Sequence, residues 1–230
     1  ALACKHYKVD LVGGDTTSST SGLVMSITAI GLEDSENIVK RNGAKANDLL
    51  VVTGDLGGAY MGLQILEREH SVYLANPDMQ PEMEGYDYIL ERQLKPEART
   101  DIKKALKELD IQPTSMIDVS DGLSSEILHL SDQSKVGFHL YEEKVPMDSL
   151  TISTAEELNL NPIMCALSGG EDYELLFTIA PEDFAKIRNH PDFFFFFHAV
   201  DLQQGNYLVA RGSNELIPLN AQGWDAFLNK

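Results

Sequence analysis

Cysteine is scarce in this chain, which has two cysteines, Cys4 and Cys165, among 230 residues. Two cysteines do not make the disulfide framework of a small secreted domain, and no Cys/His spacing typical of a zinc site is present. We therefore expect a protein of a reducing compartment, the cytoplasm. We interpret Cys165 as a core residue rather than a nucleophile.

Basic residues are also few. The 18 lysines and arginines stand against 36 aspartates and glutamates, which gives a formal net charge of −18. This balance argues against nucleic acid or an anionic membrane as the main partner, because both carry negative charge. No apolar run is long enough to cross a bilayer. The six histidines are scattered, no nucleophile–base pair stands out, and His198 is interpreted as a core residue.

Carboxylates occur beside glycine in three short segments, each next to an apolar run typical of a strand. The segments are GGDTT at 13–17, DVSDG at 118–122 and GGEDY at 169–173. The chain has no lysine-bearing phosphate loop. Carboxylates could instead hold magnesium, which supplies positive charge for a polyphosphate, while glycine lets backbone N–H groups approach the phosphates.

The second segment has the strongest chemical pattern. Asp118 and Ser120 are two residues apart on an expected strand, so their side chains face the same side. Asp121 follows at the strand end, beside Gly122. Two carboxylates and a hydroxyl at one place favour a cation, and magnesium prefers oxygen ligands. An equally good alternative is that Asp121 caps a helix that begins near Leu123.

The other glycine-rich segments are weaker when each is taken alone. Asp15 and the pair Glu171 and Asp172 each follow two glycines, and each could form an ordinary polar turn. Three such sites together favour a shared anion–metal pocket. In segment 53–63, a strand, a glycine-rich turn and a helix start follow one another, which favours an anion at the helix N-terminus. Many α/β units, however, have such a turn without a ligand.

Helices and strands alternate along the chain, which predicts an α/β or α+β fold. Residues 33–48 are interpreted as a connection between two domains. The expected strands are 9–12, 23–32, 49–53, 116–119, 136–141, 173–179, 193–200 and 207–210. The expected helices are 1–6, 59–69, 86–93, 98–109, 123–130, 151–158 and 181–188. The phenylalanine run at 193–197 is interpreted as part of a core strand.

Five stretches, in this order, resemble thiamine-monophosphate kinase, a family related to aminoimidazole ribonucleotide synthetase and selenophosphate synthetase. They are LVGGDTT at 11–17, TGDLGGAYMGL at 53–63, IDVSDGLSSEILHL at 117–130, ALSGGEDYELLFT at 166–178 and GWDAF at 223–227. LKPEAR at 94–99 also resembles a family segment of type RPxPR. The resemblance implies a two-domain synthetase-type fold. It also implies magnesium-dependent transfer of the ATP γ-phosphate to thiamine monophosphate, giving thiamine diphosphate.

The resemblance also implies roles for single residues, carried over motif by motif. The implied metal ligands, of which the last two are also catalytic, are Asp15, Asp118 and Asp121. The implied ATP contacts are Gly14, Asp15, Arg41 and Ser120, with Arg41 less secure because the loop before it differs in length. The implied contacts of thiamine monophosphate are Glu171 and Trp224. Trp224 could stack on a substrate ring or anchor the C-terminal segment to the core, and both remain open.

One departure from the family pattern concerns the N-terminal segment. Family members begin with a further segment that carries a GDDAA-type acidic motif, and no such motif precedes Asp15. We therefore expect residues 1–35 to be the end of an N-terminal ATP-binding domain and residues 36–230 to be a nearly complete C-terminal α/β domain. We expect the full-length protein to be a cytoplasmic homodimer and this chain alone to have little kinase activity. The alternatives are another ATP-dependent enzyme of the superfamily and a non-catalytic metal- or nucleotide-binding fragment.

Overall fold

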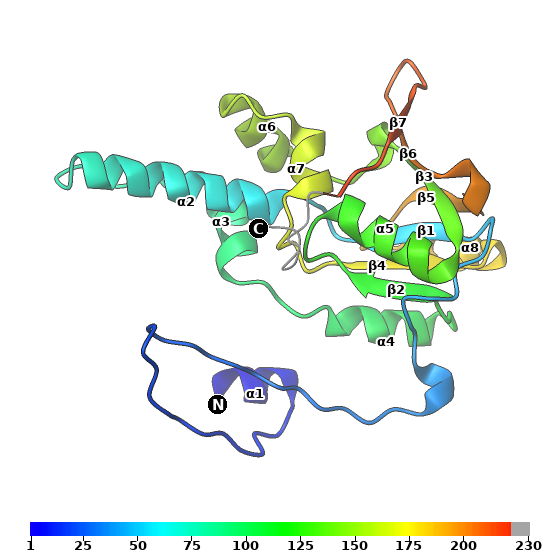
Figure 1. Cartoon of the computed structure of the whole chain (residues 1–230), viewed down its shortest axis with the longest axis horizontal. Coiled ribbons are helices and arrows are strands. Elements are labelled where there is room, and N and C mark those ends of the chain that lie inside the picture. The colour runs from blue at the N-terminus through cyan, green and yellow to red at the C-terminus, as the bar shows by residue number, and fades with distance from the viewer. Residues whose placement is uncertain (222–230) are drawn as a thin grey trace. The chain divides into compact units, whose positions relative to one another are not determined.

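The computed structural model describes residues 1–221, except for the side chains of residues 196 and 197. The chain divides into two compact parts, Ala1–Glu36 and Asn37–Lys230. We call them the first unit and the second unit and describe each by itself. Nearly all regular elements belong to the second unit (Figure 1).

The first unit contains one short helix, α1 (Leu2–Tyr7), and reaches the 3-10 turn η1 (Ser35–Asn37) at its end. The strands predicted at 9–12 and 23–32 are wrong, because residues 8–34 form no strand and are all exposed. Even Ile27 and Leu32 are 91% and 99% exposed. A strand needs a neighbour that pairs with its backbone N–H and C=O groups. None of the strands in the described residues pairs with this segment.

The second unit is built from seven strands and seven helices within the described residues. The strands are β1 (Leu49–Thr53), β2 (Ser115–Asp118), β3 (Val136–Tyr141), β4 (Leu175–Ile179), β5 (Phe193–Asp201), β6 (Asn206–Val209) and β7 (Leu216–Pro218). The helices are α2 (Gly58–Ala75), α3 (Asp87–Leu94), α4 (Thr100–Glu108), α5 (Leu123–Ser134), α6 (Ser149–Glu157), α7 (Pro162–Ser168) and α8 (Phe184–Ile187). Short 3-10 turns are η2 (Glu142–Lys144), η3 (Pro181–Asp183) and η4 (Leu202–Gln204).

All seven strands form one sheet in the order β2-β4-β1-β5-β3-β6-β7. Neighbouring strands are antiparallel except for β3 and β6, which are parallel. This mixed sheet confirms the predicted α/β (α+β) class. The pairings also place the carboxyl ends of β1, β2 and β3 beside the amino ends of β4 and β5. We call this side of the sheet the loop edge.

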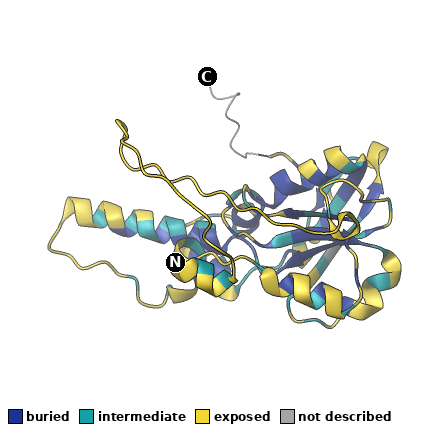
Figure 2. Ribbon diagram, turned by 90° about the horizontal axis from the view of Figure 1, so that it is seen from below, coloured by how far each residue is buried: buried dark blue, intermediate teal, exposed yellow. Residues whose placement is uncertain are grey.

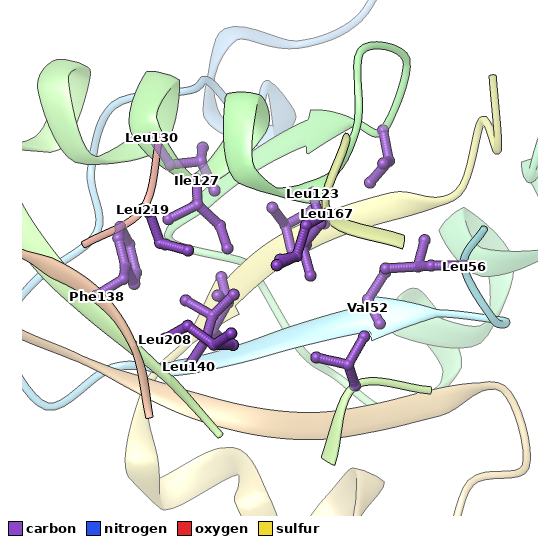
Figure 3. Packing of buried hydrophobic residues seen from close by; sticks show 14 of the residues in the cluster. Val52, Leu56, Leu123, Ile127, Leu130, Phe138, Leu140, Leu167, Leu208 and Leu219 are labelled. Carbon is purple, nitrogen blue, oxygen red and sulfur yellow. The ribbon is translucent and has the colours of Figure 1, made fainter. Parts of the chain in front are cut away.

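Both faces of the sheet are covered by helices. On one face, α5 and α7 pack onto the strands, and Figure 3 shows Leu123 and Ile127 of α5 close to Leu167 of α7. On the other face, the buried side chains of α4 and α8 pack against strand residues such as Val51 and Phe177. Val51 and its neighbour Val52 belong to different core clusters, as the two-residue period of a strand requires.

Most predicted elements exist, with shifted ends. The strand at 136–141 is confirmed with its bounds. Helix α2 runs to Ala75, beyond the predicted end at residue 69, and its last turns are mostly exposed (Figure 2). The short elements α7 and β7 were not predicted. The phenylalanine run does form a central strand, β5, in which Phe193 is buried but Phe194 is 39% exposed.

Candidate functional site

The loop edge brings together three glycine-rich motifs of the second unit. Thr53–Gly58 begins at the last residue of β1, Asp118–Gly122 begins at the last residue of β2, and Gly169–Glu174 precedes β4. Backbone hydrogen bonds join the last two loops: the Glu171 N–H donates to the Ser120 carbonyl at 2.8 Å, and the Tyr173 N–H donates to the Val119 carbonyl at 2.8 Å. Segments about fifty residues apart in sequence therefore form one surface.

The joined loops have little steric freedom. Gly170 has φ of +70°, and a Cβ atom there would lie 2.6 Å from the Ser120 carbonyl oxygen. Glu171 and Tyr173 also have positive φ values, 63° and 51°. Non-glycine residues rarely adopt this region, and such backbone is held in place by the contacts around it. These contacts therefore hold the backbone at Glu171 in place, which sets the direction of its Cα–Cβ bond.

The Tyr173 hydroxyl contacts one exposed carboxylate, and the charges of two more act on it. This hydroxyl donates to Oε2 of Glu171 at 3.2 Å. Burial and the negative charges of Glu171, Asp118 and Asp121 raise the pKa of Tyr173. Asp118, Asp121 and Glu171 are all exposed. The structure thus places Asp118, Asp121 and Glu171, three of the predicted site residues, on the two joined loops.

Asp121 does not cap α5, so that alternative is wrong. The N-cap position is Gly122, and no side chain makes the cap hydrogen bond. Buried Glu126, in the first turn of α5, reaches back and accepts a hydrogen bond from the Asp121 N–H at 3.0 Å. It also accepts from the Ser120 hydroxyl at 3.4 Å. Burial raises the pKa of Glu126.

A network of buried ion pairs supports the loops of the loop edge from the protein interior. The residue pattern did not predict this network. Glu174, with its side chain 3% exposed, forms ion pairs with Arg92 and Arg99. It also accepts a hydrogen bond from the Thr53 hydroxyl at 2.6 Å. Burial opposes the charge of Arg92, but the carboxylates of Glu174 and Asp172 raise its pKa. The one available signal was the LKPEAR stretch, which contains Arg99.

Asp172 takes the place of the anion expected at the start of α2. Its carboxylate accepts hydrogen bonds from the Gly57 N–H at 2.8 Å and the Ala59 N–H at 3.3 Å. Burial raises the pKa of Asp172 to about 7, although these N–H groups and Arg92 act against the shift. An acidic side chain is favoured at a helix N-terminus. The glycine-rich turn after β1 therefore binds a carboxylate of the protein itself.

The remaining predicted residues lie elsewhere. Gly14 and Asp15 are exposed in the first unit, where Oδ1 of Asp15 accepts a hydrogen bond from the Thr16 N–H at 2.8 Å. Arg41 is exposed in the second unit, and its carbonyl accepts a hydrogen bond from the Ser134 hydroxyl at 3.3 Å. Trp224 lies outside the described residues.

A metal ion at the loop edge would need oxygen ligands from a bound substrate in addition to the protein carboxylates. Within residues 1–221, no three Asp, Glu, His or Cys side chains are grouped so that they could hold a metal ion. Magnesium, however, commonly uses one or two carboxylates together with water and substrate phosphates. Asp118 and Asp121 are exposed carboxylates, the type of ligand that such a site uses. The described helices include none that is long and apolar enough to span a membrane.

Comparison with known proteins finds similarity to one family along most of this chain. Thiamine-monophosphate kinase of Aquifex aeolicus is 34% identical over 177 residues, which are 76% of this chain and 53% of the relative. That of Bacillus subtilis is 33% identical over 184 residues, 80% of this chain and 53% of the relative. The chain is a relative of the thiamine-monophosphate kinases. It spans about half the length of the curated relatives it matches. No protein-family model matches the chain.

Solved structures agree with this relationship. The thiamine-monophosphate kinase described as AaThiL complexed with AMPPCP and TMP aligns with a TM-score of 0.64 and 28% identity. The alignment covers 82% of this chain and 54% of that one. Escherichia coli HypE, a hydrogenase maturation protein, aligns with a TM-score of 0.58 at 17% identity, over 80% of this chain and 52% of that one. This second likeness concerns the fold alone.

Proposed function

We propose that this chain is part of an enzyme that transfers the γ-phosphoryl group of ATP to thiamine monophosphate, giving thiamine diphosphate. The observation that carries the proposal is the gathering of Asp118, Asp121 and Glu171 at the loop edge, in a relative of the thiamine-monophosphate kinases. The AaThiL structure with AMPPCP and TMP supports a nucleotide and thiamine monophosphate as the substrates.

Magnesium is part of the proposal. We assign Asp118 and Asp121 as its catalytic ligands, together with Asp15 of the first unit. Bound magnesium would neutralise negative charge on the transferring phosphoryl group. Asp118 and Asp121 fit this role because both are exposed carboxylates on one loop. Glu126 supports that loop by accepting the Asp121 N–H hydrogen bond.

The proposed substrate contacts form two groups, one for each substrate. We assign Gly14, Asp15, Arg41 and Ser120 to ATP, and Glu171 and Trp224 to thiamine monophosphate. Asp172, the neighbour of Glu171, is 3% exposed and bound to the start of α2, so we assign it a structural role. Phosphoryl transfer depends on positioning and charge neutralisation more than on covalent chemistry. A site without a nucleophile–base pair is therefore adequate.

We further propose that residues 1–35 end an N-terminal ATP-binding domain and that residues 36–230 form the C-terminal α/β domain. The exposed apolar side chains of the first unit support this division. The complete protein would be a cytoplasmic homodimer, with ATP and thiamine monophosphate as its small-molecule partners.

Activity of two proteins tests the proposal: this chain and a longer form that carries the N-terminal segment expected from the family pattern. With ATP, magnesium and thiamine monophosphate, we expect ADP and thiamine diphosphate from the longer form and little or none from this chain. Rapid turnover by this chain would refute the incomplete-site hypothesis. If the longer form binds ATP without turnover, the protein is a non-catalytic binding module. Turnover with a different acceptor would favour another enzyme of the superfamily.

A further inference from the structure

A cavity of about 670 Å³ lies in the second unit, away from the carboxylates of the proposed kinase site. Its walls come from the turn after β1, the segment after β3, the helices α6 and α7, and the start of β5. Asp118, Asp121 and Glu171 do not line it. Ligand pockets commonly have volumes of roughly 300–1,000 Å³, so this cavity has room for a small molecule.

One part of the cavity wall is apolar. Phe194 contributes an aromatic side chain that is 39% exposed, and Val145, Pro146, Met147 and Ile163 lie around the same space. Phe194 follows buried Phe193 on β5, so the strand sends alternate rings to opposite sides of the sheet. Apolar and aromatic lining with a few polar groups is typical of small-molecule sites.

The polar part of the wall is predominantly acidic. Five carboxylates line the cavity, against the two cationic side chains of Lys144 and Arg211. The Lys144 ammonium lies over the Tyr141 ring, 5.0 Å from its centroid. Asp148 and Asn161 cap α6 and α7 by accepting their first N–H hydrogen bonds. The helix ends at the cavity are therefore capped by the protein and do not call for an anionic ligand.

Asp55 gives the cavity a carboxylate with unused hydrogen-bonding capacity. Its Oδ2 atom accepts a hydrogen bond from the Tyr88 hydroxyl. Its Oδ1 atom is buried and has no hydrogen-bond partner among the described residues. A buried carboxylate oxygen is unfavourable without a partner. Because this oxygen has no accessible surface, a ligand in the cavity cannot donate to it directly. A cationic ligand would stabilise the Asp55 carboxylate through its charge, in addition to the charge of Arg92.

We propose that this cavity binds a small organic cation with an apolar body about the size of one ring. The cationic group lies near Asp55 and the exposed carboxylates of Glu143 and Glu156. The apolar body lies against Phe194, whose ring face attracts positive charge. None of the described residues assigned above to magnesium, ATP or thiamine monophosphate lines this cavity, and binding at it does not depend on the kinase function.

Three ligands with the same ring and different charge test the proposal. Benzylammonium, benzyl alcohol and benzoate are titrated into this chain, and binding is followed by calorimetry and by NMR shifts. We expect saturable binding of benzylammonium, binding of benzyl alcohol about tenfold weaker, and no binding of benzoate. Equal binding of all three, or no binding of benzylammonium, would overturn the proposal.

Variants then locate the site. Asp55→Asn keeps an acceptor for Tyr88 and removes the charge, and we expect it to weaken benzylammonium binding about tenfold. Phe194→Leu should weaken the binding of both ligands, and that of the cation more, because the ring face attracts positive charge. Glu108→Gln removes one exposed negative charge outside the cavity and should leave binding unchanged. If Asp55→Asn and Phe194→Leu both bind benzylammonium as the parent chain does, the ligand lies elsewhere and the assignment fails. Thermal unfolding of each variant verifies that it is folded.

Discussion

The loop edge carries two sets of carboxylates that differ in burial and in partners. Asp172 and Glu174 are each 3% exposed and are held by arginines, a hydroxyl and backbone N–H groups. Asp118, Asp121 and Glu171, on the same loops, are exposed. Neighbours in sequence thus separate into structural and surface roles. The difference shows that acidic residues beside glycine do not all belong to a ligand site.

Removing a charge from the buried set should have the largest effect on stability. Glu174→Gln leaves Arg92 and Arg99 without their shared carboxylate, and we expect it to lower the free energy of unfolding by about 3 kcal/mol. Asp121→Asn, its exposed counterpart, should change that energy by less than about 0.5 kcal/mol. Urea unfolding of both variants measures the comparison. Similar losses for the two would contradict the division into buried and exposed sets.

The close packing of the two motif loops predicts the next largest effect. Gly170→Ala adds a Cβ atom 2.6 Å from the Ser120 carbonyl oxygen at positive φ, and we expect a loss of about 2–3 kcal/mol. Gly85→Ala is a matched control, since Gly85 also has positive φ but nothing lies within 4 Å of its added Cβ. That control should cost about 1 kcal/mol. Equal costs measured by urea unfolding would show that the loops are not tightly joined.

The buried set should also give the protein a pH-dependent stability. The pKa of Asp172 is about 7 in the folded protein against an ordinary value of 3.8. The folded state therefore binds more protons than the unfolded state between these values. It follows that the free energy of unfolding decreases as pH rises through this range. Asp172→Asn should reduce the decrease. Unfolding midpoints measured across the range test this, and identical slopes for parent and variant would refute it.

The sequence predicted the strands of the second unit well because their apolar residues are buried between two layers. The run LLVVT became β1, and VGFHLY became β3 with its bounds. The similar apolar run at 23–32 formed no strand. Amino-acid pattern specifies which face of a strand is buried, but a strand also needs a partner for its backbone. Such partners are not visible in a local pattern.

The exposed carboxylates of the motif loops were also selected as candidates from the sequence, whereas the buried residues that support these loops were not. Glycine and carboxylate spacing marked the loops of Asp118, Asp121 and Glu171, and the structure joins these loops; the proposed roles of the three residues stay predictions. The ion network joins Thr53, Arg92 and Arg99 to Glu174, across at least 75 residues of sequence. No spacing rule predicts contacts over that distance. Helix α7 was missed because it has only seven residues and is largely apolar.

The central claim is that the exposed carboxylates serve phosphoryl transfer while the buried ones hold the loops. Its most direct test is the kinase activity of Asp118→Asn in the longer form of the protein, measured together with its unfolding midpoint. We expect at least a roughly hundredfold loss of thiamine diphosphate formation, with the midpoint unchanged and Glu108→Gln as an active control. Activity of Asp118→Asn within a fewfold of the parent protein would contradict the account.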